Sequence, residues 1–233
     1  SVGATGISID DVAVTSGYVC GGSTAPVRSR ADFNGDGISD LSVFRPSEGN
    51  WYLNLSNVVP GGLSGFNVVH WGAAGDSLVP GDYDGDGRTD FAVWRANDTQ
   101  GAPDFYILNS NDFTYSGIAF GSTGDIPLAG DYDGDGKTDA AIYRPSEGNW
   151  YLWSSQTGGT TVVPFGNATD IPISMNIDGD AKADLAVYRP SENTWYIQKS
   201  DGSGVSVYAF GSTGDKLVPA DYDGDDKDDV AVF

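Results

Sequence analysis

The sequence has little of what disulfide scaffolds, His-rich metal sites and nucleic-acid-binding proteins need. Its 233 residues include one Cys and one His, which excludes an internal disulfide framework and a His-rich zinc site. Only 12 residues are Lys or Arg, against 33 that are Asp or Glu. The net charge of −21 argues against nucleic acid and anionic lipid as direct partners. Glu is also scarce, since it occurs only at Glu48, Glu147 and Glu192 and every other acidic residue is Asp.

Long hydrophobic runs and helical periodicity are missing too. No apolar run approaches the ~18 residues of a membrane span, so we expect no membrane insertion. No segment carries a sustained helical period with caps. Instead, short runs rich in Val, Tyr, Phe and Trp are separated by Gly, Pro, Asn and Ser, which predicts an all-β chain.

The Asp residues are concentrated in five variants of one nine-residue pattern. The first three variants read DFNGDGISD, DYDGDGRTD and DYDGDGKTD, and the last two read NIDGDAKAD and DYDGDDKDD. We call them loops one to five, and they occupy residues 32–40, 82–90, 131–139, 176–184 and 221–229. Their starts are 50, 49, 45 and 45 residues apart, a period typical of solenoids, arrays or propellers.

The segments between the loops also repeat. Each loop is followed by a short apolar run, and after loops one to four come a turn, an aromatic strand such as Trp51-Tyr52, and a β-rich run ending in a pair such as Phe120-Gly121. About four strands per ~45–50 residues is the signature of a propeller blade. We therefore predict a single β-propeller domain over residues 1–233, most simply with five blades, in which N- and C-terminal strands close one blade. The alternative is a fragment of a longer ring.

The composition of the loops favours a hard cation. Side-chain oxygens at positions 1, 3, 5 and 9, with the carbonyl of position 7, can surround one ion. Ca²⁺ accepts 6–8 oxygen ligands in irregular geometry, whereas Mg²⁺ demands an octahedron, and the lack of N and S ligands disfavours zinc and copper. An EF-hand is excluded because position 12 counted from Asp82 is Val93, where that motif needs Glu.

The pattern Asp-x-Asp-Gly-Asp-Gly-x-x-Asp, with a preceding Phe-Gly pair, resembles the FG-GAP (or VCBS) repeat. That family includes the integrin alpha-subunit propeller, secreted bacterial proteins and fungal lectins. The resemblance implies hairpin loops that bind Ca²⁺, with one ion per loop and about five ions in all. The implied ligands are the side chains at positions 1, 3, 5 and 9 and the carbonyl at position 7: Asp32, Asn34, Asp36, Ile38 and Asp40; Asp82, Asp84, Asp86, Arg88 and Asp90; Asp131, Asp133, Asp135, Lys137 and Asp139; Asn176, Asp178, Asp180, Lys182 and Asp184; Asp221, Asp223, Asp225, Lys227 and Asp229.

Two loops depart from the family pattern. Loop four begins with the neutral Asn176 and has Ala181 where Gly is expected, so we expect strain there and the weakest site. Loop five has Asp226 in the same Gly position, which Asp tolerates better than Ala does.

Other repeated residues have structural explanations that compete with functional ones. The Trp-Tyr pairs could stack on sugar rings, but we expect them in the core between blades. The repeated arginines could bind an anion, but we expect each to form a structural tie to an acidic or carbonyl group in the adjacent blade; they are Arg45, Arg95, Arg144 and Arg189. A set of Asp residues six positions before the later loops is expected to cap turns; it comprises Asp76, Asp125, Asp170 and Asp215.

The resemblance favours a calcium-stabilised propeller that serves as a non-catalytic binding or adhesion module for a glycan or an extracellular protein. Extracellular calcium modules bind with Kd of roughly 10⁻⁴–10⁻³ M, and such sites would be mostly empty in the cytosol, so we expect a secreted or cell-surface protein. A purely structural spacer domain is the alternative. A calcium-dependent propeller enzyme, such as a polysaccharide lyase, is disfavoured because no residue set breaks the symmetry of the repeats, and we expect no catalytic site.

Overall fold

The computed structural model of the protein describes residues 31–56, 65–97 and 99–233, and within these ranges every helix-or-strand element is a β-strand. The strands form four antiparallel sheets, blades one to four, in which each strand pairs with the next along the chain. Blade one contains β1 (Leu41–Arg45), β2 (Asn50–Asn54) and β3 (Phe66–His70); blade two contains β4 (Ser77–Leu78), β5 (Phe91–Trp94), β6 (Phe105–Leu108) and β7 (Tyr115–Ile118); blade three contains β8 (Ile126–Gly130), β9 (Asp139–Arg144), β10 (Asn149–Trp153) and β11 (Thr160–Pro164); blade four contains β12 (Ile171–Met175), β13 (Asp184–Arg189), β14 (Thr194–Gln198) and β15 (Val205–Ala209). Within the described part of the chain we find no helix with the length and hydrophobicity that a membrane span requires.

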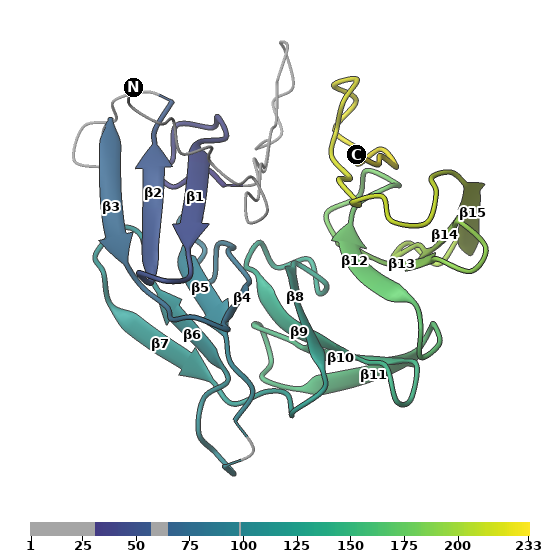
Figure 1. Ribbon diagram of the computed structural model, residues 1–233, viewed down its shortest axis with the longest axis horizontal. Coiled ribbons are helices and arrows are strands. Elements are labelled where there is room, and N and C mark those ends of the chain that lie inside the picture. The colour runs from purple at the N-terminus through teal and green to yellow at the C-terminus, as the bar shows by residue number, and fades with distance from the viewer. Residues whose placement is uncertain (1–30, 57–64, 98) are drawn as a thin grey trace, which may run out of the picture.

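The four blades follow one another around an arc, with blade one and the C-terminal segment at its two ends (Figure 1). This is a β-propeller arrangement, as the sequence predicts. The core lies between consecutive blades. Between blades one and two, for example, Phe44 and Trp51 pack in one cluster with Phe91 and Val93. Because both faces of a blade are covered, strands such as β5 are buried along their whole length and read as continuous apolar runs.

Blade one differs from blade four on one face, the face that in blade four packs against the preceding blade. Leu41 and Val43 of β1 are 61% and 36% exposed, whereas the corresponding Leu185 and Val187 of β13 are 6% and 1% exposed. In blade four these positions pack against blade three. Blade one therefore presents an apolar face that, in the later blades, the preceding blade covers.

The expectation of five blades is wrong, because the described residues form four. The C-terminal segment carries loop five and pairs with itself only through isolated bridges, Leu217 with Val232 and Ala220 with Asp229. Val230 packs against the core cluster of blade four. Within the described residues, no further strand joins the bridged C-terminal segment to form a sheet. The N-terminal strands that were expected to complete such a blade fall in residues 1–30, outside the described ranges. A repeat count overestimates the blades here because an acidic loop is present without a full sheet after it.

Candidate metal centre

The acidic loops lie at one end of the blades, where the chain turns into the strand that follows each loop. Loops two, three and four connect β4 to β5, β8 to β9 and β12 to β13. Loop one precedes β1, and loop five lies in the C-terminal segment. All the ligand residues expected from the sequence are within the described ranges, so the geometry of each loop can be compared.

In loops one, two, three and five, the carboxylate at position 1 organises the turn, whereas loop four begins with Asn176. In loop two, Asp82 Oδ1 accepts a hydrogen bond from the Gly85 N–H (2.7 Å), and Asp82 Oδ2 accepts one from the Gly87 N–H (2.9 Å). These two glycines have φ of +82° and +85°, a region that favours glycine. The same two bonds recur in loops one, three and five. The Gly positions are thus needed to aim backbone N–H groups at this carboxylate.

The last carboxylate of the loop joins it to the rest of its blade. Asp90 is fully buried; its Oδ2 accepts the Tyr83 N–H (2.9 Å) and its Oδ1 accepts the Ser110 N–H (2.8 Å) from the end of β6. Asp40, Asp139 and Asp184 make the equivalent pair of bonds. Position 9 therefore fastens the loop to the neighbouring hairpin, whatever else it binds.

The sequence interpretation missed a recurring serine after the second strand that follows each of loops one to four. Ser56, Ser155 and Ser200 donate their Oγ hydrogens to the position 5 carboxylates, at 2.7, 3.0 and 2.9 Å. The fourth, Ser110, is buried and its Oγ has no partner within the described residues. The signal was available, because a Ser recurs 16 residues after Asp40, Asp139 and Asp184.

Three loops bring carboxylate oxygens close enough to share one cation. One oxygen from each of three Asp residues lies within 4.8 Å of the others in loops two, three and five; the groups are Asp82, Asp84 and Asp86, then Asp131, Asp133 and Asp139, then Asp221, Asp223 and Asp225. Loops one and four, which contain Asn34 and Asn176, form no such group. In loop four, however, Asp178 Oδ2 is buried without a hydrogen-bond partner. These oxygen-only donor sets fit a hard divalent cation such as Ca²⁺.

Two carboxyl groups of loop two, those of Asp90 and Asp84, have raised pKa values. Burial raises the pKa of Asp90 to about 7. Burial, followed by repulsion from Asp86, also raises the pKa of Asp84. Without a bound cation, Asp90 and Asp84 therefore keep a proton at higher pH than an ordinary Asp does.

Loop four does not adopt the strained turn expected at Ala181. The residue is not among those with positive φ, whereas Asp226 at the same position of loop five has φ of +64°. In loop four the Asn176 amide donates to the Asp180 carbonyl (2.6 Å), a bond that an Asp at this position could not make. The expected backbone strain is therefore present in loop five and absent from loop four.

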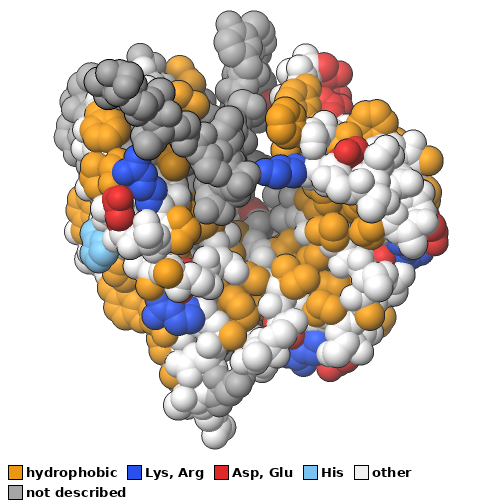
Figure 2. Space-filling view, in the orientation of Figure 1, with side chains coloured by type: hydrophobic (Ala, Val, Ile, Leu, Met, Phe, Trp, Pro, Cys, Tyr) orange, Lys and Arg blue, Asp and Glu red, His pale blue; other side chains and the backbone are white. Residues whose placement is uncertain are grey.

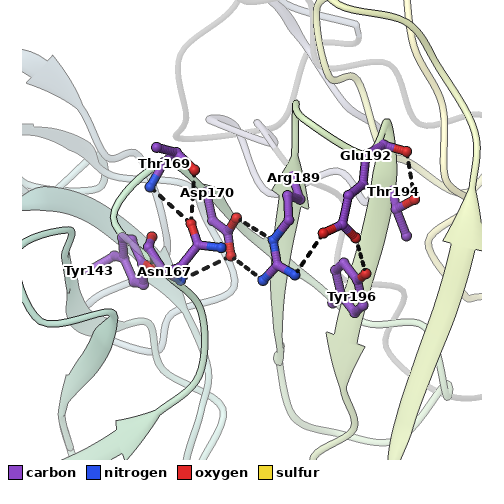
Figure 3. A network of polar contacts seen from close by, with 8 residues as sticks. All are labelled: Tyr143, Asn167, Thr169, Asp170, Arg189, Glu192, Thr194 and Tyr196. Atoms are coloured by element: carbon purple, nitrogen blue, oxygen red, sulfur yellow. Dashed lines mark hydrogen bonds and ion pairs between the residues drawn. The ribbon is translucent and has the colours of Figure 1, made fainter.

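The opposite end of the blades carries the repeated arginines, and Figure 3 shows how carboxylates hold one of them, Arg189. Arg189 donates from Nε and Nη2 to the two oxygens of Asp170, both at 2.9 Å, and its guanidinium lies 4.6 Å from the centre of the Tyr196 ring. Asp170 also accepts the Asn167 N–H and so caps a turn. Glu192 accepts from Arg189 and from the Tyr196 hydroxyl.

The same arrangement holds Arg95 to Asp76 and Arg144 to Asp125. Figure 2 shows blue and red side chains beside one another at several points around the visible face. The expectation of turn-capping aspartates is met in these three blades. The arginines are structural ties as expected, but each binds the Asp in the turn just before its own blade and not a group in the adjacent blade. The expectation that both members of each Trp-Tyr pair lie in the core is met only by the tryptophans. Trp51, Trp150 and Trp195 are buried core residues, while their tyrosine neighbours are half-buried beneath the arginines.

Together these features define a β-propeller whose blades carry acidic hairpin loops with a shared hydrogen-bond pattern. The chain belongs to the FG-GAP-like repeat family, whose model matches residues 32–93, 82–142 and 176–232. No curated protein sequence matches significantly.

Among solved structures, the chain is similar to a lectin from Agrocybe aegerita that specifically recognises non-reducing terminal N-acetylglucosamine. The identity is 15% and the TM-score 0.53, over 87% of this chain and 59% of the lectin. A BBS1N structure, in complex with ARL6DN and soaked with lead, matches with 10% identity and a TM-score of 0.44, over 84% of this chain and 58% of that one. The chain thus spans less than two thirds of either structure, and the lectin supports the propeller fold.

Proposed function

We propose that this protein is a calcium-binding, calcium-stabilised β-propeller that serves as a non-catalytic binding module. The observation that carries the proposal is the convergence of three carboxylates, within 4.8 Å, in each of loops two, three and five. Like charges at this separation repel unless a cation or a proton lies among them. Membership of the FG-GAP-like repeat family supports calcium as that cation.

The residues that would hold the ion are those of the loop itself. The carboxylates at positions 1, 3 and 5 would supply oxygens, with the position 9 carboxylate and the position 7 carbonyl as further donors. Bound calcium would supply the positive charge that the described residues do not place at Asp82, Asp84 and Asp86 as a Lys or Arg ion pair. The hydrogen bonds from Gly85, Gly87 and Arg88 orient these carboxylates in advance.

Weak calcium binding would still matter to stability. At ten times Kd, one site adds about 1.4 kcal/mol to the free energy of unfolding, and several sites together rival the ~5–15 kcal/mol of a whole domain. Because sites with Kd of roughly 10⁻⁴–10⁻³ M fill only where calcium is abundant, we place the protein outside the cell or on its surface.

We propose a glycan or an extracellular protein as the ligand of the module. The support is the fold shared with a lectin. The second candidate is a spacer domain. It is favoured by the arginines, whose guanidinium groups are already held by Asp76, Asp125 and Asp170.

A glycan array read under three conditions tests recognition. The conditions are the wild-type protein in calcium, the wild-type protein in EDTA, and a variant in calcium with Asn at position 5 of every loop (Asp36, Asp86, Asp135, Asp180 and Asp225 replaced). Asn keeps the hydrogen bond to the position 7 N–H but removes a negative ligand. We expect glycan binding in the first condition only. A folded wild-type protein that binds no glycan in calcium would contradict glycan recognition and favour the spacer.

A further inference from the structure

Consecutive acidic loops are joined by a hydrogen bond that links one loop's position 8 to the preceding loop's position 1. The Thr138 N–H of loop three donates to the Asp82 carbonyl of loop two at 2.6 Å. Equivalent bonds of 2.7 Å run from Thr89 to Asp32, from Ala183 to Asp131 and from Asp228 to Asn176. Each loop is therefore anchored to the loop before it, directly beside the residue that begins the preceding site.

The side chain at position 7 continues this contact over the preceding loop. A methyl group on Gly85 of loop two would lie 3.0 Å from Lys137 Cε and 3.1 Å from Lys137 Cγ of loop three. The same closeness, at 3.0 Å, holds for Gly35 beneath Arg88, for Gly134 beneath Lys182 and for Gly179 beneath Lys227. The aliphatic part of each position 7 side chain thus lies on the turn whose N–H groups orient the preceding loop's first ligand.

The row of loops has two ends, and they lack this contact. At position 7 of loop one, Ile38 is 45% exposed. At position 4 of loop five, Gly224 has open space where a side chain would begin. Loops one to four are therefore each covered by the next loop, whereas no described residue covers loop five in this way.

We propose that the position 7 side chain of each loop is a positioning residue for the calcium site of the loop before it. Arg88, Lys137, Lys182 and Lys227 hold the turns of loops one to four in the shape that presents their carboxylates, and the contact is made by the aliphatic stem. This inference rests on the proposed calcium binding. It adds that the side chain at position 7 acts on the calcium site of the preceding loop and not on the site of its own loop.

Lys137 gives the sharpest test, because its carbonyl belongs to loop three while its side chain covers loop two. A calcium titration followed by NMR reads the two loops separately through the amides of Gly87 and Gly136, which donate to the first carboxylates of loops two and three. In Lys137→Ala we expect the calcium midpoint at Gly87 to rise about tenfold, the usual effect of losing an outer-shell support, while the midpoint at Gly136 stays within twofold of wild type.

Lys137→Met is the matched control, since it keeps an unbranched stem over Gly85 and removes the charge. We expect its Gly87 midpoint to stay close to wild type or to fall. Ile38→Ala, at the uncovered end of the row, should move neither amide. An unchanged Gly87 midpoint in Lys137→Ala, a shift at Gly136 alone, or an equal loss in Lys137→Met would each overturn the inference. If no amide of the wild-type protein responds to calcium, the proposed function itself fails, which is a distinguishable result.

Discussion

Loops three and five have the same four Asp ligands but very different surroundings. In loop three, Asp133 accepts hydrogen bonds from Ser154 Oγ (2.6 Å) and the Gln156 N–H (3.3 Å). Burial raises the pKa of Asp133, but these bonds, together with the Asp135 N–H and the charge of Lys182, lower it overall. In loop five, the corresponding Asp223 is exposed and repulsion from Asp225 raises its pKa. Loop three is also covered by Lys182, whereas Gly224 of loop five is open.

The difference shows how one motif can depend on metal to different degrees. The carboxylates of loop three have protein donors that hold them in place before any ion binds. Those of loop five have few such donors among the described residues, so a cation has more repulsion to relieve there. We therefore expect loop three to be ordered without calcium and loop five to become ordered with it.

Removing the position 9 carboxylate should produce the largest contrast between the two loops. Asp139 is buried and accepts from the N–H groups of Tyr132, Asp133 and Ser155. In Asp139→Ala these donors lose their acceptor, and we expect the free energy of unfolding in EDTA to fall by about 3 kcal/mol. Asp229→Ala, whose carboxylate accepts from Tyr222, should lose much less. Urea unfolding of both variants measures the difference, and equal losses would contradict the contrast.

The buried carboxylates of the interior loops should also make the metal-free protein respond to acid. The pKa of Asp90 is raised to about 7 in the folded state, above the ~3.9 of an unfolded Asp, so between these values the folded state holds the additional proton. Its contribution to stability therefore grows as the pH falls from 7 towards 4, by at most about 1.4 kcal/mol per pH unit.

Urea unfolding in EDTA at several pH values checks this prediction against Asp90→Asn. The wild-type protein should gain stability relative to the variant as the pH falls. In saturating calcium the trend should reverse, because protons compete with the metal for carboxylates. A wild-type protein that loses stability relative to Asp90→Asn in EDTA over this range would refute the assignment.

Neutralising position 3 should have opposite effects in the two loops. Asp133→Asn weakens the charge-assisted bonds from Ser154 and Gln156, so we expect a loss of about 1 kcal/mol in EDTA. Asp223→Asn removes the repulsion with Asp225 and should raise the unfolding midpoint in EDTA. Both variants should bind calcium less tightly. Thermal unfolding in EDTA separates them, and a shift of the same sign in both would count against the comparison.

The smallest effect is expected from backbone strain at position 6. Asp226 has φ of +64°, so Asp226→Gly relieves an unfavourable conformation and should add a few tenths of a kcal/mol, roughly. Ala181 of loop four does not have positive φ, so Ala181→Gly should instead cost about 0.5 kcal/mol. The denaturant midpoints of Asp226→Gly and Ala181→Gly measure these two changes. A higher midpoint in Ala181→Gly than in the wild-type protein would show that loop four is strained after all.

The sequence was sufficient for features that lie within one repeat. The spacing of the Asp and Gly residues predicted the loops, and the repeated apolar runs and aromatic pairs, such as Trp150 with Tyr151, predicted the blades and their core. It was insufficient where contacts join distant segments. Ser110 meets Asp90 across 20 residues, and the turn at Asn176 depends on one amide hydrogen.

The number of blades also depends on contacts between segments. Leu41 and Leu185 occupy equivalent positions of the repeat, yet only the second is covered by a neighbouring blade. The sequence of one repeat does not show whether another blade packs against it, so the repeat period alone overestimated the number of sheets.

Thermal unfolding in millimolar calcium and in EDTA tests the central claim, that divalent ions at the acidic loops stabilise the propeller. Several sites that each contribute about 1.4 kcal/mol should raise the unfolding midpoint of a chain of this size by about 10 °C or more. Magnesium at the same concentration should give a much smaller rise, because it demands octahedral geometry and retains its water. A midpoint that differs by only about one or two degrees between calcium and EDTA would contradict the account.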